Sequence, residues 1–175
     1  MGLSCDYSRL FLAFPATELS ESLSLLQDQL ALPGRRVPVH QFHLTLRFLG
    51  ALTPTQFDSL HRQLSGVRLA KFHLRLDNLG YFPKAQVAWL GPTRVPTALS
   101  TLYQELLLRC ASLRLAKPHK AYRPHVSVYR NTPAPPRITI SPLAFSPPYL
   151  ALYNSTASEQ GVHYEELARW PLVKS

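Results

Sequence analysis

The segment His43–Leu46, with the sequence HLTL, recurs 82 positions later as HVSV at His125–Val128. Both segments follow the pattern histidine-apolar-hydroxyl-apolar. Side chains along a β-strand point alternately to its two faces. Each segment therefore places its histidine and its hydroxyl on one face and its two apolar residues on the other. The apolar face can pack on a hydrophobic core while the imidazole and the hydroxyl line a cleft.

Two such strands, brought together, would offer two imidazoles and two hydroxyl groups. Histidine titrates near neutral pH, so one ring can donate a proton while the other accepts one. This combination suits chemistry at a phosphate, where one oxygen is protonated and another loses a proton. The alternative is a pair of structural histidines on half-buried strands, but the repetition favours function. The pattern is absent around the other five histidines, His40, His61, His73, His119 and His163.

The composition predicts one globular domain whose charge suits a polyanion, the alternative being a basic surface that only solvates the protein. The 175 residues can bury a substantial core, and 19 Lys and Arg against 10 Asp and Glu give a net charge of +9, which suits RNA. No apolar run is long enough to span a membrane, and no signal peptide is apparent. Cys5 and Cys110 have no zinc-site or CxxC spacing, and neither is a nucleophile candidate, so we expect a reduced, cytoplasmic protein.

Two arginines stand close to the motifs. Arg47 follows His43 by four residues, and Arg123 precedes His125 by two. Strict strand alternation puts both arginines on the cleft face, where they could bind a phosphate. The alternative for each is an ordinary solvent-facing strand residue.

The wider pattern alternates strands with a few helices. Helices are predicted over 17–30, from Thr53-Pro54 onward, and over 97–113, with a turn at 80–83. Prolines interrupt 131–148, where only an edge strand at 137–140 is expected. Strands are predicted over 9–14, 42–49, 72–76, 86–90, 123–130 and 149–155, and 164–172 is a strand or a short helix. This order predicts an α+β fold with antiparallel sheets, and a faint duplication around the motifs suggests two similar lobes.

The sequence lacks the other common catalytic signatures. There is no Walker A loop, GxGxxG, HExxH, GxSxG or paired-cysteine motif. The two histidine motifs contain no carboxylate that would complete a metal coordination shell. We therefore expect neither a catalytic metal nor another cofactor.

Longer stretches around both motifs resemble the 2H phosphoesterase superfamily. Within it, the chain is similar to the bacterial RNA 2′,3′-cyclic phosphodiesterases, also called 2′-5′ RNA ligases. This resemblance implies one domain over residues 1–175, made of two pseudo-symmetric lobes, with two antiparallel sheets facing a central cleft and helices on the outside. The matching stretches are Arg9–Phe14, His43–Gly50, Gly80–Phe82, Val87–Gly91, Arg123–Arg130, Leu150–Tyr153 and Tyr164–Leu172.

The resemblance also implies metal-independent hydrolysis of a ribose 2′,3′-cyclic phosphate to a 2′-phosphate. By analogy with the family, His43 protonates the leaving 3′-oxygen and His125 accepts a proton from the attacking water, although the sequence itself allows the reverse. Thr45 and Ser127 would donate hydrogen bonds to the other phosphate oxygens. Ser127 stands where the family more often has threonine, and the hydroxyl is retained.

The remaining candidates bind the phosphate or the base. The family usually keeps a basic residue at Arg130, but strict alternation turns that side chain away from the cleft and favours Arg47 and Arg123. Phe82 or Tyr81 could stack on a base, and burial in the core is the alternative for both.

The expected partners are RNA ends, tRNA among them, or nucleotides that carry a 2′,3′-cyclic phosphate, bound by a monomer. Reversal of similar chemistry could join RNA ends through a 2′-5′ bond. Two other functions stay open at this point. A 2H enzyme could act on another phosphodiester, such as a 2′-5′ oligonucleotide, or the chain could be an RNA-binding module without catalysis.

Overall fold

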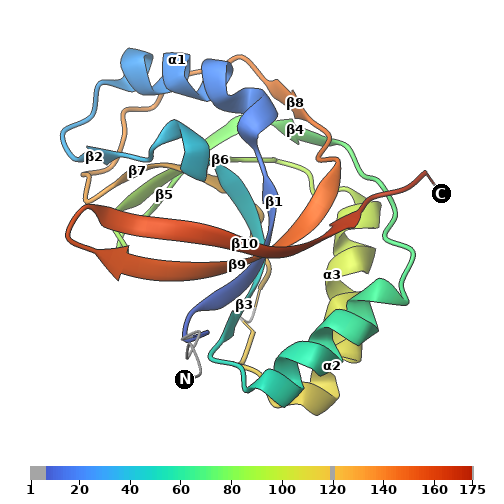
Figure 1. Ribbon diagram of the computed structural model, residues 1–175. Helices are drawn as coiled ribbons and strands as arrows, with labels where there is room; N and C mark the ends of the chain where they lie inside the picture. The colour runs from blue at the N-terminus through green and yellow to red at the C-terminus, as the bar shows by residue number, and fades with distance from the viewer. Residues whose placement is uncertain (1–6, 119–120, 175) are drawn as a thin grey trace.

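A computed structural model describes residues 7–118 and 121–174 of the chain. Cys5 and His119, and with His119 part of the basic loop before the second motif, lie outside the described residues. Within them the chain forms an α+β fold with antiparallel sheets, as the sequence predicts (Figure 1). Among the described residues, no helix is long and apolar enough to cross a membrane.

The main sheet has the strand order β10-β9-β1-β3-β7-β6-β5, and the short strand β2 also pairs with β7. Neighbouring strands along this order are antiparallel. A separate small sheet pairs β4 with β8. The strands are β1 Leu10–Pro15, β2 Arg35–Arg36, β3 His43–Gly50, β4 Leu74–Leu76, β5 Asn78–Phe82, β6 Val87–Gly91, β7 Val126–Arg130, β8 Leu143–Phe145, β9 Tyr149–Ser158 and β10 Gly161–Pro171.

The centre of the main sheet is a narrow junction between the two motif strands. β3 and β7 are joined at the pair Leu44 and Val126. We call the strands on one side (β10, β9, β1 and β3) the His43 half, and those on the other side (β7, β6 and β5) the His125 half. The two sheets expected from the sequence are thus joined into one by a single pair of residues.

The two halves repeat a strand-helix-strand unit. β1, α1 (Ser20–Leu30) and β3 form the first unit, and β6, α3 (Thr97–Arg109) and β7 form the second. The register corresponds as well: Phe14 pairs with Leu44 in the first unit, as Leu90 pairs with Val126 in the second. Each motif strand therefore lies beside a strand from its own unit and beside the motif strand of the other.

The helices form because their apolar residues recur on one face. Leu23, Leu26 and Leu30 of α1 are buried at that spacing. α2 (Pro54–Ser65) begins with a capping box in which Thr53 and Gln56 satisfy each other's backbone N–H groups. Figure 1 shows α1 at the top of the sheet and α2 and α3 at the lower right. Side chains from all three helices join the core-facing strand residues in one hydrophobic cluster.

Several elements differ from the prediction in their bounds or their type. The first helix starts as a 3-10 turn at Thr17–Leu19, and the third ends at Arg109 before a further 3-10 turn at Ala111–Leu113. The predicted turn at 80–83 is wrong, because β5 runs through Asn78–Phe82 and pairs with β6. The expected edge strand at 137–140 is also wrong. The strand of that region is β8, which lies in the proline-free segment between Pro142 and Pro147, where every residue has a backbone donor.

Candidate active site

The junction between β3 and β7 brings the two motifs together on one face. Continuing the antiparallel register by one residue on each side of the Leu44–Val126 pair sets His43 opposite Ser127 and Thr45 opposite His125. The apolar residues of the pair are fully buried on the other face, whereas the four motif side chains are partly exposed. Two histidines and two hydroxyls separated by 82 positions in the sequence therefore share one surface.

Both imidazole rings are oriented by a carbonyl two residues earlier in the chain. Nδ1 of His43 lies 2.7 Å from the carbonyl oxygen of Gln41, which ends the 3-10 turn Val39–Gln41. Nδ1 of His125 lies 2.7 Å from the carbonyl oxygen of Arg123. A carbonyl can only accept, so Nδ1 carries the proton in both rings. Nε2 is then the nitrogen that exchanges protons with a ligand in each case.

Aromatic rings enclose His43. Phe11 of β1 lies 5.1 Å from the imidazole between ring centroids, and Tyr164 of β10 meets it edge-on at 5.3 Å. Tyr153 of β9 stands behind them at 6.5 Å. These three rings come from the strands of the His43 half, so the sheet itself removes water from one side of the imidazole.

His125 has its own aromatic wall. Phe82 of β5 meets the imidazole edge-on at 4.9 Å, and Trp89 of β6 lies 5.8 Å away. The indole lies across Gly80, where an added Cβ would stand 2.1 Å from the ring. Glycine at position 80 therefore leaves the space that the indole of Trp89 occupies beside His125.

Electrostatics keep His43 uncharged when no ligand is present. Burial lowers its pKa from 6.5 to about 4, and the charge of Arg130, together with that of His125 whenever it is protonated, acts in the same direction, against the stabilising hydrogen bond to Gln41. Arg130 and His125 therefore both lie close enough to His43 for their charge to affect its protonation. An anion bound between these groups would reverse part of this shift.

A β-bulge decides where Arg47 points. Along β1 and β3, Ala13 pairs with Thr45 and Leu12 with Arg47, so Leu46 is an extra residue in the ladder. The alternation therefore slips by one, and Arg47 shares the core face with Leu12. The expectation that strict alternation brings Arg47 to the cleft is wrong for this reason.

Arg47 is buried on that opposite face and does not meet the two histidines. Its Nη2 donates to the carbonyl oxygen of Ala116 at 3.3 Å, and its charge opposes the burial that raises the pKa of the Cys110 thiol. Within the described residues, Nε and Nη1 of this arginine are buried without a hydrogen-bond partner. Cys110 itself is buried and unpaired by a disulfide.

A second bulge lies at the equivalent position of the other motif strand and shifts the alternation in the same way, but there it brings an arginine to the cleft face. Trp89 pairs with Ser127 and Ala88 pairs with Tyr129, so Val128 is the extra residue. Tyr129 then faces the core, where its hydroxyl donates to the carbonyl oxygen of Gln27 on α1. Arg130 returns to the face that carries His125 and Ser127. The family position, which strict alternation disfavours, is thus the arginine that the fold delivers to the site.

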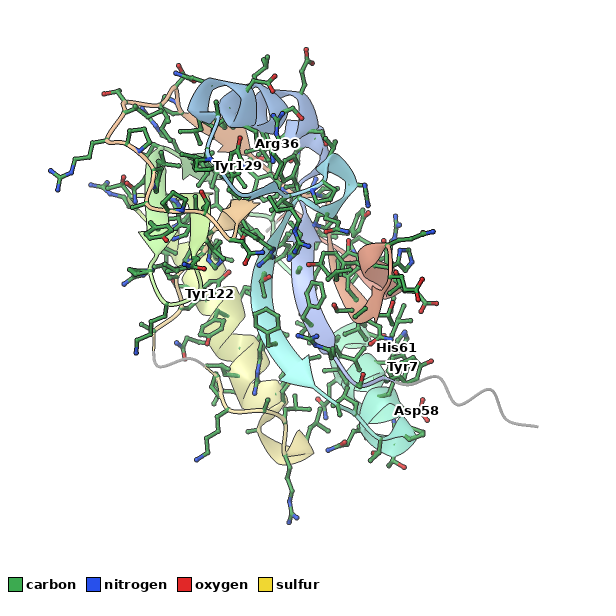
Figure 2. The ribbon with its side chains drawn as sticks, turned by 90° about the vertical axis from the view of Figure 1, so that its left-hand side faces the viewer. Tyr7, Arg36, Asp58, His61, Tyr122 and Tyr129 are labelled. Atoms are coloured by element: carbon green, nitrogen blue, oxygen red, sulfur yellow. The ribbon has the colours of Figure 1, made fainter. Side chains whose placement is uncertain are left out.

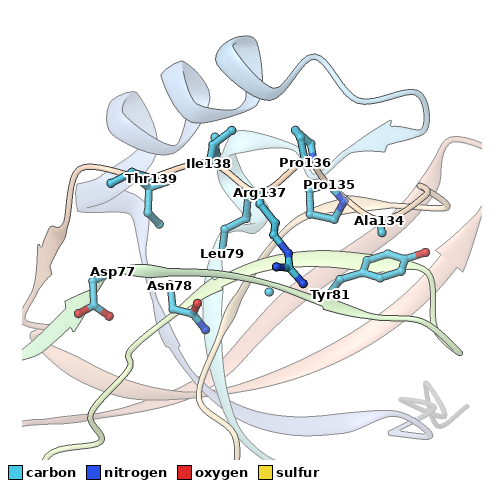
Figure 3. Close-up of a pocket in the computed structure, with 12 residues that line it drawn as sticks. Asp77, Asn78, Leu79, Tyr81, Ala134, Pro135, Pro136, Arg137, Ile138 and Thr139 are labelled. Carbon is cyan, nitrogen blue, oxygen red and sulfur yellow. The ribbon is translucent and has the colours of Figure 1, made fainter.

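Of the other predicted residues, some lie at the site and some lie away from it. Phe82 lies against His125, as described above. The side chain of Arg123 is exposed, and its part in the site is the carbonyl that orients His125. Tyr81 projects from β5 to the other face, where its hydroxyl donates to the carbonyl oxygen of Thr132 at 2.7 Å. There Tyr81 lines a cavity of about 460 Å³ with Pro135 and Arg137 (Figure 3), and His125 is not among the residues that line it.

Sequence reasoning missed three residues around the site. Phe48 follows the first bulge and reaches the cleft face, where it is 56% exposed and packs on Phe11. Arg35 lies on β2 across from Arg130. Tyr122 stacks on Tyr103 of α3 and donates a hydrogen bond from its hydroxyl to the carbonyl oxygen of Thr45 (Figure 2). The spacing of Tyr122, three before His125, was the one signal in the sequence that placed any of them near a motif.

Among the residues that the structure describes, no three His, Cys, Asp or Glu side chains come together as a metal site would require. The groups that do come together are two imidazoles, two hydroxyls and a guanidinium. They can transfer protons and bind a phosphate without further ligands.

Comparisons with known proteins agree with this geometry. The family model for LigT-like phosphoesterases matches residues 14–89. The RNA 2′,3′-cyclic phosphodiesterase of Escherichia coli K12 is 30% identical over 145 residues, which are 81% of each chain. The protein of the same name from Geobacillus stearothermophilus is 28% identical over 95% of this chain and 58% of its own length.

The fold comparison extends over nearly the whole chain. The crystal structure of E. coli LigT complexed with 3′-AMP superposes with a TM-score of 0.84 at 27% identity, covering 95% of this chain and 99% of that one. The agreement of sequence, fold and paired motifs has one consequence. The chain belongs to the LigT-like phosphoesterases of the 2H superfamily.

Proposed function

We propose that the protein hydrolyses the 2′,3′-cyclic phosphate of RNA ends or nucleotides to a 2′-phosphate. The observation that carries the proposal is the pair of imidazoles on one sheet face, each with Nε2 directed away from its carbonyl partner. The relatives named RNA 2′,3′-cyclic phosphodiesterase support the same reaction.

The reaction needs one proton removed and one supplied. Water attacks phosphorus opposite the bond to the 3′-oxygen, a new P–O bond forms, and the P–O3′ bond breaks. Nε2 of His125 takes the proton of the water, and the proton on Nε2 of His43 goes to the 3′-oxygen, which leaves as an alcohol. Solvent then restores the two rings to their starting states.

This assignment requires the substrate to charge His43. A ring with a pKa of about 4 holds little proton at neutral pH, and the positive charge of Arg130 contributes to that value. A cyclic phosphate carries one negative charge, and an opposite charge within a few ångströms raises a histidine pKa by about 1–3 units. Binding of the substrate would thus prepare the acid. If bound phosphate leaves His43 neutral, the two histidines have the reverse roles.

The remaining groups bind the phosphate. Thr45 and Ser127 stand beside the imidazoles and can donate to the non-bridging oxygens, and Arg130 adds a positive charge where negative charge accumulates. Phe82 stands where it can border a bound base. Arg47 and Tyr81 point to the other face, so the proposal gives them no part in binding.

Other elements of the proposal concern the setting. We expect RNA ends, tRNA among them, as substrates, and a monomer that acts in the cytoplasm. The chemistry needs no metal. Ligation of RNA ends through a 2′-5′ bond would use the same proton transfers with a 5′-hydroxyl in place of the attacking water: the 5′-oxygen would bond to phosphorus as the P–O3′ bond breaks.

The test is an RNA with a 2′,3′-cyclic end, incubated in chelator with the wild type, His43→Ala and His125→Ala. We expect a 2′-phosphate from the wild type and losses on the order of 10²–10⁴ in each variant. His163→Ala, an exposed histidine on β10, is the control and should keep full activity. Retained activity in both motif variants would refute the mechanism, and turnover only with added metal would refute its metal independence. RNA binding without turnover by the wild type would indicate a binding module.

A further inference from the structure

Arg35 and Arg130 lie directly across from each other on two paired strands. β2 consists of Arg35 and Arg36, and it pairs with the end of β7 so that Arg35 faces Arg130 and Arg36 faces Tyr129. Side chains of directly opposed residues project to the same face, with Cβ atoms about 5 Å apart. The two arginines therefore stand side by side.

Their neighbours show which face this is. Tyr129 donates to a carbonyl of α1, and Arg36 reaches the same helix, where it contacts the Ser24 carbonyl and the carboxylate of Asp28. Figure 2 shows Arg36 and Tyr129 together beneath α1. Alternation then places Arg35 and Arg130 on the opposite face, and the influence of Arg130 on His43 confirms that this is the face of the site.

The charges on that face are not balanced. Arg36 pairs with Asp28 at 2.7 Å, but among the described residues neither Arg35 nor Arg130 forms an ion pair. Like charges directly opposite each other destabilise a sheet, so this arrangement costs free energy unless an anion lies between or beside them. Arg35 is also exposed, which leaves its guanidinium free to reach a ligand.

The backbone holds Arg35 at this position. Gly34, with a φ of +134°, packs so closely on the end of β7 that an added Cβ would stand 2.7 Å from the carbonyl oxygen of Asn131 and 2.9 Å from that of Arg130. Only glycine fits this contact, and it brings β2 directly onto the strand that carries the second motif.

We propose that Arg35 binds a second phosphate of the substrate, the phosphodiester on the 5′ side of the terminal nucleoside, while Arg130 binds the cyclic phosphate. This inference rests on the proposed function and specifies its substrate class. An RNA chain carries such a phosphate and a nucleoside 2′,3′-cyclic phosphate does not. A 5′-phosphate on a mononucleotide offers the same chemistry, so it enters the test as a separate substrate.

The experiment compares kcat/KM for four substrates. They are a nucleoside 2′,3′-cyclic phosphate, its 5′-phosphorylated form, a dinucleotide with a 2′,3′-cyclic end, and that dinucleotide with an uncharged methylphosphonate in place of the internal phosphodiester. The enzymes are the wild type, Arg35→Gln and, as the matched control, the neighbouring Arg36→Gln, whose side chain points to α1. Far-UV circular dichroism and thermal unfolding accompany each variant.

The quantity to compare between the enzymes is kcat/KM for the dinucleotide divided by kcat/KM for the nucleoside 2′,3′-cyclic phosphate. In the wild type, the dinucleotide should exceed the bare nucleoside in kcat/KM by about tenfold, and Arg35→Gln should abolish that advantage. Replacing the internal phosphodiester by methylphosphonate should lower kcat/KM of the wild type by about the same factor. It should not lower kcat/KM of Arg35→Gln any further, because the substitution in the enzyme and the substitution in the substrate remove the same interaction. The salt dependence of kcat/KM for the dinucleotide should also be shallower in Arg35→Gln, by about 0.7 in the log–log slope. Arg36→Gln should behave as the wild type.

Two results would overturn the inference while the proposed function stands: a dinucleotide advantage that survives Arg35→Gln, or equal losses in Arg35→Gln for substrates with and without the internal charge. An advantage restored fully by the 5′-phosphorylated mononucleotide supports the phosphate site and assigns it to small nucleotides as well as to chains. A wild type that cleaves none of the four substrates would refute the proposed function and this inference with it.

Discussion

The two motif strands carry the same pattern and the same irregularity, yet they deliver different chemistry to the cleft. Each has an extra residue three positions after its histidine, Leu46 in β3 and Val128 in β7, and β3 has a further one at Leu49. In both strands the bulge turns the next residue to the core and the one after it to the cleft. The cleft thus receives Phe48 from the His43 half and Arg130 from the His125 half.

This difference separates two tasks within a nearly symmetric frame. The His125 half supplies the cation, and its neighbouring strand β2 adds a second one. The His43 half supplies aromatic rings, which enclose its imidazole and lower its pKa. Similar backbones can therefore hold one ring that burial keeps neutral at rest and a partner ring on the half that carries the arginines, because the side chains next to them differ.

The largest expected effect on kcat/KM comes from removing the positive charge of Arg130, which only the His125 half provides. Arg130→Gln should lower kcat/KM for a 2′,3′-cyclic phosphate by about 10²–10³, since it removes a positive charge from the phosphate. Arg137→Gln, an exposed arginine outside the cleft, is the control and should change it less than twofold. If Arg130→Gln kept wild-type activity, the contrast between the halves would have no catalytic meaning.

The next effect tests the aromatic enclosure of His43 through pH. The pKa of His43 is about 4 in the folded chain and near 6.5 when unfolded. At pH values between these two pKa values, His43 is protonated in the unfolded chain and neutral in the folded chain. The free energy of unfolding therefore falls as the pH drops below about 6.5. From pH 7 to pH 5, the wild type should lose about 2 kcal/mol of unfolding free energy relative to His43→Asn.

Chemical denaturation of both proteins at the two pH values measures this loss. Repeating it in saturating inorganic phosphate should shrink the difference, because a bound anion raises the pKa of His43. A wild type and a variant with parallel pH dependence would show that the rings around His43 do not exclude its proton.

The smallest effect concerns the arginine that the first bulge turns away. Arg47 is buried with two nitrogens that lack partners among the described residues. Arg47→Met keeps an unbranched side chain and removes that charge, so the unfolding free energy should stay within about 1 kcal/mol of the wild type or rise. Activity should change less than threefold, as measured by kcat/KM on a cyclic phosphate. A loss near that of Arg130→Gln would place Arg47 in the site after all.

Much of the site could be predicted because strand alternation is a local property. The hydroxyl of Thr45 follows His43 by two residues, and Ser127 follows His125 by two, so one rule places all four side chains. The hydrophobic stripes of the helices and the capping residues of α2 are equally local, and the structure contains those helices with boundaries shifted by a few residues.

The errors share a cause that no local rule contains. A bulge arises from the pairing of one strand with another, and nothing in the letters LTLRF or VSVYR marks the extra residue. Alternation alone therefore favoured Arg47 over Arg130 for the cleft, and the structure shows the reverse. For Tyr81 and Phe82, the sequence could not tell which of the two side chains shares the sheet face of His125, because that depends on the pairing of β5 with β6. The place of Arg35 beside the site could not be predicted, because β2 has only two residues and forms only by pairing with β7.

The amino-acid order alone sufficed to identify the reacting groups. On a half-buried strand, a period of two puts the imidazole and the hydroxyl on the exposed face and the apolar residues on the buried face. The meeting of those groups depended on the long-range pairing at Leu44 and Val126. Which cations accompany them depended on two bulges and a glycine contact, since hydrogen bonds between distant strands, and not the residues in between, determine where the alternation slips.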